Sequence, residues 1–180
     1  MSATPPVLRF GDDVLNPVVG SRVGGSGSSG AAVLYYSAKC GSVIAKFVLE
    51  GAADHEASML TECASPHVVR MIAVLRRVQF RGQYRDVILM AACEGGDMSY
   101  GKVPWLVAVV AMLESSCGLH YAHQRGISHN DLKGLNILRS VGGIAILGDF
   151  GSACRDDGTT GVTSGESGQW NTRGWWSGWL

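Results

Sequence analysis

Short runs of apolar residues, bounded by Gly, Ser or charged side chains, occupy the first half of the chain. Runs of this length that are rich in Val, Ile, Leu and Tyr are typical of strands. They predict strands at residues 31–36, 42–48, 71–78 and 84–92. Residues 1–17 contain prolines and polar side chains instead, and we expect a loosely ordered lead-in there.

Two stretches place apolar residues at helical spacing. The shorter, from Asp54 to Cys63, carries Glu56 on the same face as Met59 and Leu60 and predicts a short helix. The longer, residues 103–124, predicts a long helix. Its expected buried stripe consists of Leu106, Val109, Val110, Leu113, Cys117 and Tyr121.

Two apolar runs near the C-terminal third, residues 137–138 and 144–147, predict a β-hairpin. The chemistry-bearing residues of the chain cluster around this hairpin. Before it stands His129-Asn130-Asp131-Leu132-Lys133, followed by Asn136, and after it stands Asp149-Phe150-Gly151. A hairpin with carboxylates and an amide at its two ends can hold a metal ion and orient a nucleophile, which is what phosphoryl transfer requires.

Composition narrows the class of protein without identifying it. The 180 residues hold 15 basic and 15 acidic side chains, so charge balance gives no reason to expect a nucleic-acid partner. Five scattered cysteines without CxxC pairs argue against a disulfide framework or a zinc site. The N-terminus lacks a signal-peptide pattern, and the apolar run 105–113 is too short to span a bilayer. We therefore expect a soluble, intracellular protein of the cytoplasm or nucleus, with no membrane partner.

A glycine-rich stretch precedes the first predicted strand. Gly25, Gly27 and Gly30 fit the pattern G-x-G-x-x-G, in which backbone N–H groups approach phosphates because no Cβ stands in the way. A stretch this rich in Gly and Ser is also typical of a flexible linker. The predicted strands that follow, without a helix, favour a phosphate-covering loop between antiparallel strands over a dinucleotide-binding fold.

The motifs, taken in order, resemble those of eukaryotic-type serine/threonine protein kinases. H-N-D-L-K-x-x-N and D-F-G resemble the family's catalytic and metal-binding loops, and Val43-Ile44-Ala45-Lys46 resembles its V-A-I-K strand. The resemblance covers roughly residues 20–155. It implies an α+β, two-lobe kinase fold, with an antiparallel five-stranded N-lobe that carries one helix, and a mainly helical C-lobe.

The resemblance also implies roles for individual residues and the cofactors ATP and Mg²⁺. Asp131 and Lys133 are the expected catalytic residues, as base and charge stabiliser, while Asn136 and Asp149 are the expected metal ligands. The expected nucleotide-binding residues run from the glycine loop to the segment after the last N-lobe strand. They are Gly25, Gly27, Gly30, Ala45, Lys46, Glu56, Met90, Cys93 and Asp97.

The chain departs from the family pattern in three ways. Asn130 replaces the arginine that pairs with a phosphorylated activation segment, so control by phosphorylation becomes less expected. The HND triplet also occurs in choline-kinase-like and aminoglycoside-kinase-like enzymes, although Lys133 and Gly151 favour the protein-kinase side. Only a Trp- and Gly-rich tail follows the DFG segment, which predicts an incomplete C-lobe that a partner would cover. The phrases HEASML and LGDFGSAC are similar to herpesvirus serine/threonine kinases, which suggests a viral source.

These expectations divide the chain into four parts. They are a flexible lead-in (1–17), a kinase N-lobe (18–92), a partial C-lobe (93–155) and an atypical tail (156–180). The predicted function is ATP-dependent phosphorylation of Ser or Thr in protein substrates, impaired to the extent that the C-lobe is incomplete. Two alternatives stay open: a nucleotide-binding pseudokinase or interaction module, and a small-molecule kinase.

Overall fold

The computed structural model describes residues 4–21, 31–99 and 103–156. The chain divides into two compact units. Unit 1 comprises residues 1–58 and 70–92, and unit 2 comprises residues 59–69 and 93–180. The boundary after residue 92 coincides with the predicted end of the N-lobe. The segment 59–69 was expected in the N-lobe but belongs to unit 2.

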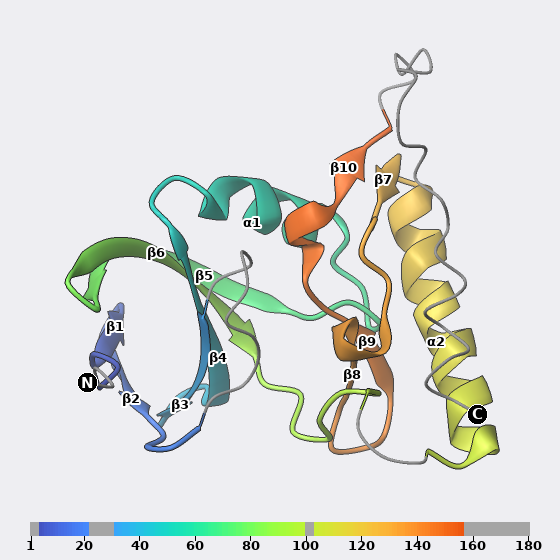
Figure 1. The fold of residues 1–180 in the computed structure, drawn as a ribbon, viewed down its shortest axis with the longest axis horizontal. Helices are drawn as coiled ribbons and strands as arrows, with labels where there is room; N and C mark the ends of the chain where they lie inside the picture. Colours follow the sequence, from blue (N-terminus) through green and yellow to red (C-terminus); the bar gives the residue numbers. More distant parts are fainter. Residues whose placement is uncertain (1–3, 22–30, 100–102, 157–180) are drawn as a thin grey trace. The chain divides into compact units, whose positions relative to one another are not determined.

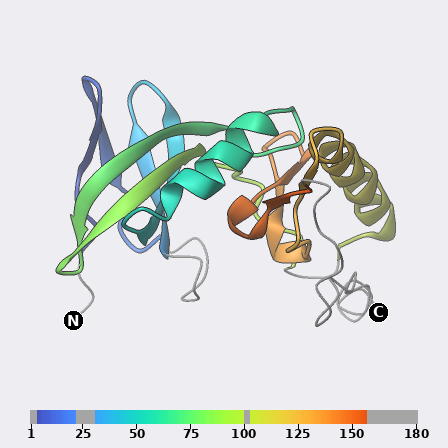
Figure 2. The same ribbon diagram turned by 90° about the horizontal axis from the view of Figure 1, so that it is seen from above.

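Unit 1 is built on one antiparallel sheet, which twists strongly along its longest hairpin (Figures 1 and 2). The order of its strands is β1-β2-β3-β4-β6-β5. The strand bounds are β1 Leu8–Phe10, β2 Asp13–Pro17, β3 Ala31–Ser37, β4 Gly41–Leu49, β5 Met71–Phe80 and β6 Gln83–Ala91. The helix α1, Ala53–Glu62, follows β4 and begins in unit 1. The four strands and the short helix predicted here are therefore present, with ends shifted by one or two residues.

The prediction of five strands was wrong, because the residues that the structure describes form a sheet of six. Residues 8–17, expected as part of a loosely ordered lead-in, form β1 and β2. Buried polar contacts hold this segment: Asp13 accepts a hydrogen bond from the hydroxyl of buried Ser37, and the Tyr35 hydroxyl donates to the Pro6 carbonyl at 2.8 Å. The partners lie far along the chain on β3, so local sequence did not reveal them.

Side chains alternate between the two faces of this sheet, as the pleat of a strand requires. One face forms the core of unit 1, where β4 contributes Val43, Ala45 and Phe47. Phe47 stacks on Phe80 with ring centroids 4.2 Å apart. The opposite face of β4 carries Ile44 and Lys46.

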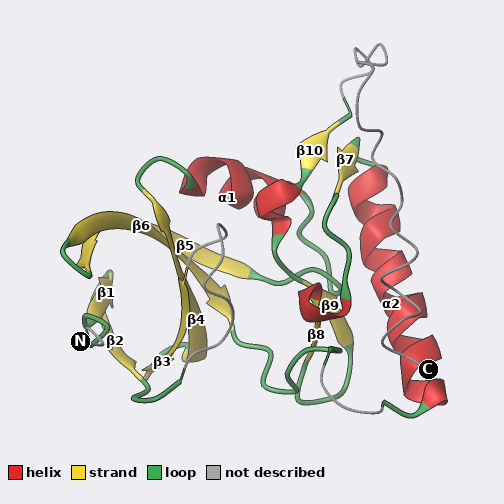
Figure 3. Ribbon diagram, in the orientation of Figure 1, coloured by secondary structure: helices red, strands yellow, loops and turns green. Residues whose placement is uncertain are grey.

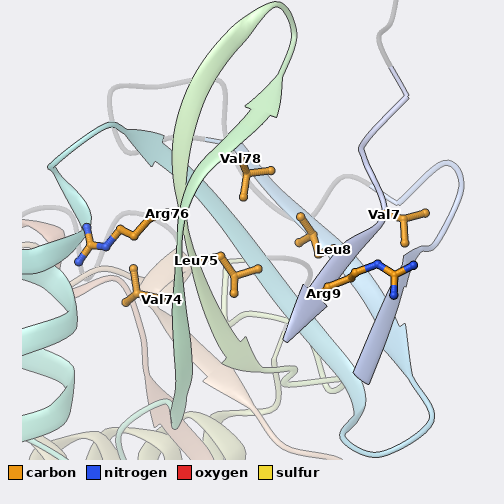
Figure 4. A pocket seen from close by; sticks show the side chains of 7 residues that line it. All are labelled: Val7, Leu8, Arg9, Val74, Leu75, Arg76 and Val78. Atoms are coloured by element: carbon orange, nitrogen blue, oxygen red, sulfur yellow. The ribbon is translucent and has the colours of Figure 1, made fainter. Parts of the chain in front are cut away.

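The two edge strands of the sheet, β1 and β5, line one pocket of 540 Å³. Val7 and Leu8 reach it from one edge, and Leu75 and Val78 reach it from the other (Figure 4). β1 and β5 stand at the two ends of the strand order, so they can line one pocket only because the sheet curls and brings its edges to face each other.

The described residues of unit 2 form one long helix and two small antiparallel sheets. The helix is α2, Trp105–His123, and it packs against the β8–β9 hairpin (Figure 3). The hairpin pairs β8 Ile137–Arg139 with β9 Ala145–Leu147, as the sequence predicts, and the second sheet pairs β7 Ile127–Ser128 with β10 Cys154–Arg155. Two short 3₁₀ turns, η1 Gly134–Asn136 and η2 Phe150–Ser152, lie beside the hairpin in sequence.

The predicted buried stripe of α2 was wrong. Leu106 and Leu113 are 58% and 63% exposed, whereas small residues form the buried face. The buried residues are Ala108, Ala111, Ser115, Gly118 and Ala122. Gly118 gives the reason, because a Cβ there would lie 2.8 Å from the His67 carbonyl oxygen. The helix lies so close to its neighbours that only small side chains fit between them.

By length and composition alone, α2 could cross a membrane. This differs from the expectation that the apolar run there was too short. This is weak evidence for a membrane span, because the core helix of a soluble protein can have the same length and apolar composition.

Candidate active site

Lys46 and Glu56 form a buried ion pair in unit 1. The Lys46 Nζ donates to both carboxylate oxygens of Glu56, at 2.8 and 2.7 Å, and the two residues are 7% and 3% exposed. β4 supplies the lysine, and the first half of α1 supplies the glutamate. A buried charge is costly unless it is paired and hydrogen-bonded, so this bidentate contact stabilises both side chains in one geometry. The sequence pattern that singled out Glu56 on an apolar helix face is explained by this partner.

Ala45 does not lie on the face of Lys46. It is fully buried in the core of unit 1, because alternation along β4 turns it to the opposite side. Ile44 occupies the lysine's side instead. Met90 is the cross-strand partner of Ile44 on β6, so it shares that face. Met90 therefore lies on the face of Lys46 and Ala45 on the opposite face, and the roles of both in nucleotide binding stay predictions.

The kinase resemblance implies that backbone groups of residues 91–93, at the end of β6 and just after it, bind adenine. Two N–H groups there already have protein partners: Ala91 donates to the Arg70 carbonyl at 2.9 Å, and Ala92 donates to the Ser42 carbonyl at 3.3 Å. These two donors are thus not free for a ligand.

In unit 2, Cys93 is partly buried, and burial raises the pKa of its thiol. Asp97 accepts hydrogen bonds from the backbone N–H and the hydroxyl of Ser99 through Oδ1. The predicted glycine loop with Gly25, Gly27 and Gly30 lies outside the described residues.

Asp131, Lys133 and Asn136 form a connected polar group in unit 2. The Lys133 Nζ donates to Asp131 Oδ2 at 2.7 Å, and the Asn136 amide nitrogen donates to the same oxygen at 3.0 Å. The same amide nitrogen also donates to the Asp131 backbone carbonyl at 2.7 Å. The turn η1 brings these residues together, because it reverses the chain between Lys133 and β8. Lys133 and Asn136, which the kinase resemblance singled out together with Asp131, therefore both contact its carboxylate.

His129 ties the first loop to the second. Its Nε2 lies 2.9 Å from the Gly148 carbonyl oxygen, and its Nδ1 accepts a hydrogen bond from the Asp131 N–H at 3.3 Å. These partners fit the neutral ring with the proton on Nε2. The ring meets Phe150 edge to face, with centroids 4.7 Å apart. Burial lowers the pKa of His129, and this effect exceeds the opposing influence of the Gly148 carbonyl and of the carboxylates of Asp131 and Asp149.

Asp149 and Asn130 adopt left-handed backbone conformations, with φ of 57° and 61°. Such a conformation is uncommon for residues other than glycine, and it persists where the surroundings impose it. Gly148, just before Asp149, donates its N–H to the Asn136 carbonyl at 2.9 Å. The loop that carries Asp149 is therefore held both by His129 and by the residue expected to share the metal.

The residues expected to hold Mg²⁺ have the right chemistry. Magnesium prefers oxygen ligands and is usually held by one or two carboxylates together with substrate phosphates and water. The Asn136 amide turns its nitrogen to Asp131, which leaves Oδ1 as the ligand atom, and Asp149 supplies a carboxylate. Over the described residues there is no cluster of three or more His, Cys, Asp or Glu residues suited to a metal. A magnesium site with two protein ligands, completed by phosphates, does not require such a cluster.

Asn130 has a role that the sequence did not predict. Its side-chain nitrogen donates to the Ser152 carbonyl at 3.3 Å and to the Cys154 sulfur at 3.0 Å. It thus links the Asp131 loop to the segment after Asp149 with neutral hydrogen bonds. The signal available in the sequence was the replacement of the family's arginine at this position.

A lysine–glutamate pair beside an antiparallel sheet, with paired Asp–Asn and Asp-Phe-Gly loops, defines a protein of the kinase class. Comparison with known proteins agrees with this class. Residues 20–171 match the family described as the protein kinase domain, and the chain belongs to this family.

Several protein kinases and cell-division proteins share sequence with the chain. Cell division control protein 7 of Schizosaccharomyces pombe is 33% identical over 87 residues, which are 43% of this chain and 8% of that protein. Cytokinesis protein sepH of Emericella nidulans is 37% identical over 81 residues, 42% of this chain and 6% of that protein. Mitogen-activated protein kinase kinase kinase 3 of Arabidopsis thaliana is 31% identical over 105 residues, 56% of this chain and 15% of that protein. The chain thus matches only a small part of each relative's length.

Proposed function

We propose that the chain catalyses the transfer of the γ-phosphoryl group of ATP to serine or threonine hydroxyls of a protein substrate. The observation that carries the proposal is the contact of Asp131 with both Lys133 and Asn136. The Asp131 carboxylate is thereby held beside the Lys133 ammonium and beside the Asn136 amide, which we propose as a metal ligand. Phosphoryl transfer needs these groups, because its catalysis consists mainly of positioning and of electrostatic stabilisation.

In the proposed mechanism, Asp131 orients the substrate hydroxyl through Oδ1 and accepts its proton. The bond from the substrate's hydroxyl oxygen to the γ-phosphorus forms as the bond from that phosphorus to the β–γ bridging oxygen breaks, and ADP leaves. Lys133 lies beside Asp131 and stabilises negative charge on the transferred group. Asn136 and Asp149 would hold Mg²⁺, which supplies positive charge to the phosphates. Lys46, fixed by Glu56, would bind the α- and β-phosphates.

The choice of Ser and Thr rests on the resemblance of the HNDLK loop to that of serine/threonine kinases. The match of the chain to the protein kinase domain, together with the names of its relatives, supports protein over metabolite substrates.

The test is phosphate transfer from radiolabelled Mg-ATP to a basic peptide and to casein by the purified chain. We expect Asp131→Asn to lower the rate by about 10²- to 10⁴-fold, the usual contribution of a positioned general base. Ser116→Ala, a change at an exposed residue of α2 whose hydroxyl donates only to the Met112 carbonyl of the same helix, serves as the control. Phosphoamino-acid analysis of the product then identifies the acceptor hydroxyl.

Three results would contradict the proposal. If Asp131→Asn or Asp149→Ala retained full Mg-ATP-dependent transfer, the assigned residues would be wrong. Nucleotide binding without transfer would identify a pseudokinase. Turnover of choline or an aminoglycoside, but not of peptides, would identify a small-molecule kinase.

A further inference from the structure

The hairpin β5–β6 contains an irregularity beside α1 that the kinase motifs do not explain. Leu75 pairs with Val87, but the next paired residue on β5 is Val78, opposite Arg85. Arg76 and Arg77 therefore face the single residue Asp86 on β6. This is a β-bulge, and bulges re-aim side chains near functional sites.

Asp86 holds the bulge in place from within the protein. It is 1% exposed, and its Oδ1 accepts the Arg77 N–H at 3.2 Å, where Arg77 has a φ of 53°. Its Oδ2 accepts the Gly51 N–H at 2.9 Å, just before α1 begins, and the Arg76 guanidinium at 2.7 Å. Burial acts to raise the pKa of Asp86, but these hydrogen bonds and the charge of Arg76 outweigh it and keep the pKa below its ordinary value. The Asp86 carboxylate is thus a charged anchor with three contacts, two from backbone N–H groups and one from the Arg76 guanidinium.

Arg76 extends from this anchor to α1. One guanidinium nitrogen binds Asp86, and the other binds the carboxylate of Asp54 in the first turn of the helix. Figure 4 shows the Arg76 side chain directed toward the helix, away from Leu75 and Val78. The planar fork of arginine suits this bridge, because its two ends can each bind a carboxylate in fixed geometry.

The bridge acts on the same helical turn that carries Glu56. Residues two positions apart on an α-helix point in directions about 200° apart, since each residue turns the helix by about 100°. Asp54 and Glu56 therefore project from opposite sides of the first turn, one to Arg76 and the other to Lys46. Contacts on both sides fix the rotation of the helix about its axis.

We propose that Arg76 is a positioning residue, which is anchored on Asp86 and holds Asp54 so that the first turn of α1 keeps Glu56 on Lys46. The inference rests on the proposed function only where it concerns catalysis, because the position of Glu56 can be measured without turnover. The outer half of the bridge is exposed, with Asp54 and Arg76 side chains 71% and 45% accessible. Its strength should therefore fall as salt rises.

The experiment measures the rate at which an amine-acylating reagent modifies Lys46, by peptide mass spectrometry on the full chain. Lys46 is buried in its ion pair, so modification requires release from Glu56. Asp54→Asn removes the outer carboxylate and leaves the Arg76–Asp86 pair intact. Arg76→Lys keeps the positive charge but removes the planar fork whose two nitrogens reach Asp86 and Asp54 separately. Asp12→Asn is the matched control, because it removes an exposed ion pair with Lys39 elsewhere in unit 1.

We expect Asp54→Asn and Arg76→Lys each to raise the Lys46 rate about two- to fivefold, the range typical of exposed ion pairs. In the double variant the two effects should not multiply, since they remove the same bridge. Salt at about 1 M, where the Debye length is about 3 Å, should raise the wild-type rate toward that of Asp54→Asn. Asp12→Asn should change the rate at Lys39 and leave Lys46 unaffected.

An unchanged Lys46 rate in Asp54→Asn would overturn the inference, and so would an equal increase in Asp12→Asn, which would indicate general loosening of the unit. Where the chain is active, kcat/KM for ATP should fall only by the loss of the fraction of molecules in which the Lys46–Glu56 pair is formed, which is small while the pair stays mostly closed. If no transfer is detected at all, the labelling experiment still decides the role of Arg76, while the proposed function fails separately.

Discussion

At the scale of single residues, the chemistry depends on side chains that hold one another. Asp131 is fixed by Lys133 and Asn136, and His129 connects that group to the loop of Asp149. His129 is the least replaceable of these, because both ring nitrogens are used in a buried place. Its protonation would break the contact with the Asp131 N–H, since a charged ring has no acceptor.

The first prediction concerns pH. The pKa of His129 lies below its ordinary value near 6.5, so the unfolded chain takes up a proton at a higher pH than the folded chain. The free energy of unfolding should therefore fall as the pH is lowered from about 7 toward 5, by at most about 1.4 kcal/mol per pH unit for this one proton. Urea unfolding at a series of pH values measures the slope.

His129→Gln should make that slope shallower than in the wild type. His123→Gln, which removes an exposed imidazole on α2, corrects for the general effect of losing a histidine. An identical slope in wild type and His129→Gln would mean that His129 takes up its proton equally in both states, contrary to the geometry.

At the scale of elements, the size of a side chain decides whether it is buried in α2 more than its hydrophobicity does. Its large apolar residues are exposed, and its small residues face the neighbouring strand and the His67 backbone. Close approach, rather than the burial of a leucine stripe, sets the position of this helix. The β5–β6 bulge likewise shows that one buried carboxylate can redirect an arginine from solvent toward a helix.

The second prediction follows for Gly118. A methyl group at this position would lie 2.8 Å from a backbone oxygen, which cannot move aside like a flexible side chain. Gly118→Ala should lower the free energy of unfolding by about 1–3 kcal/mol, as overpacking of a tight interface does. Gly142→Ala is the control, since its Cβ would meet its nearest neighbour at an ordinary 3.7 Å. Equal melting temperatures of the two variants would contradict the close packing.

At the scale of the whole molecule, the chain carries its candidate chemistry in two compact units. Unit 1 holds Lys46, which we propose to bind phosphates, and its partner Glu56, while unit 2 holds the Asp131 group and Asp149. The proposed function requires both sets of residues to act on one nucleotide. Ligand binding is therefore the property that tests the molecule as a whole.

The third prediction is a ligand-dependent shift of stability. A ligand that binds only the folded chain stabilises it by about 2.7 kcal/mol when present at about 100 times its Kd. Mg-ATP should therefore raise the melting temperature, and removal of Mg²⁺ with a chelator should reduce the shift, because Asn136 and Asp149 would lose the ion they share with the phosphates. Lys46→Met should reduce it as well.

Lys39→Met serves as the control for Lys46→Met, since it removes an exposed lysine of unit 1. A full Mg-ATP shift that survives both Lys46→Met and chelation would show that the nucleotide binds elsewhere.

The sequence by itself determined the family, most strands and helices, and the residues of the Asp131 group. It could do so because these features are local: periodicity marks the elements, and the motif residues lie within a few positions of each other. Helical spacing also singled out Glu56 as a lone carboxylate on an apolar face, and the resemblance to kinases implied its place at the nucleotide site with Lys46.

Only the tertiary structure decided which faces pack and which partners meet. Ala45 turned out to lie in the core, α2 to bury its small residues, and residues 8–17 to extend the sheet. Arg76 lies near the end of the predicted strand 71–78, and nothing in that pattern indicated that it binds a buried carboxylate ten residues later. Each of these outcomes depends on a contact between separate strands or helices, and the free energy of such contacts comes from burial and close fit, which a local pattern does not contain.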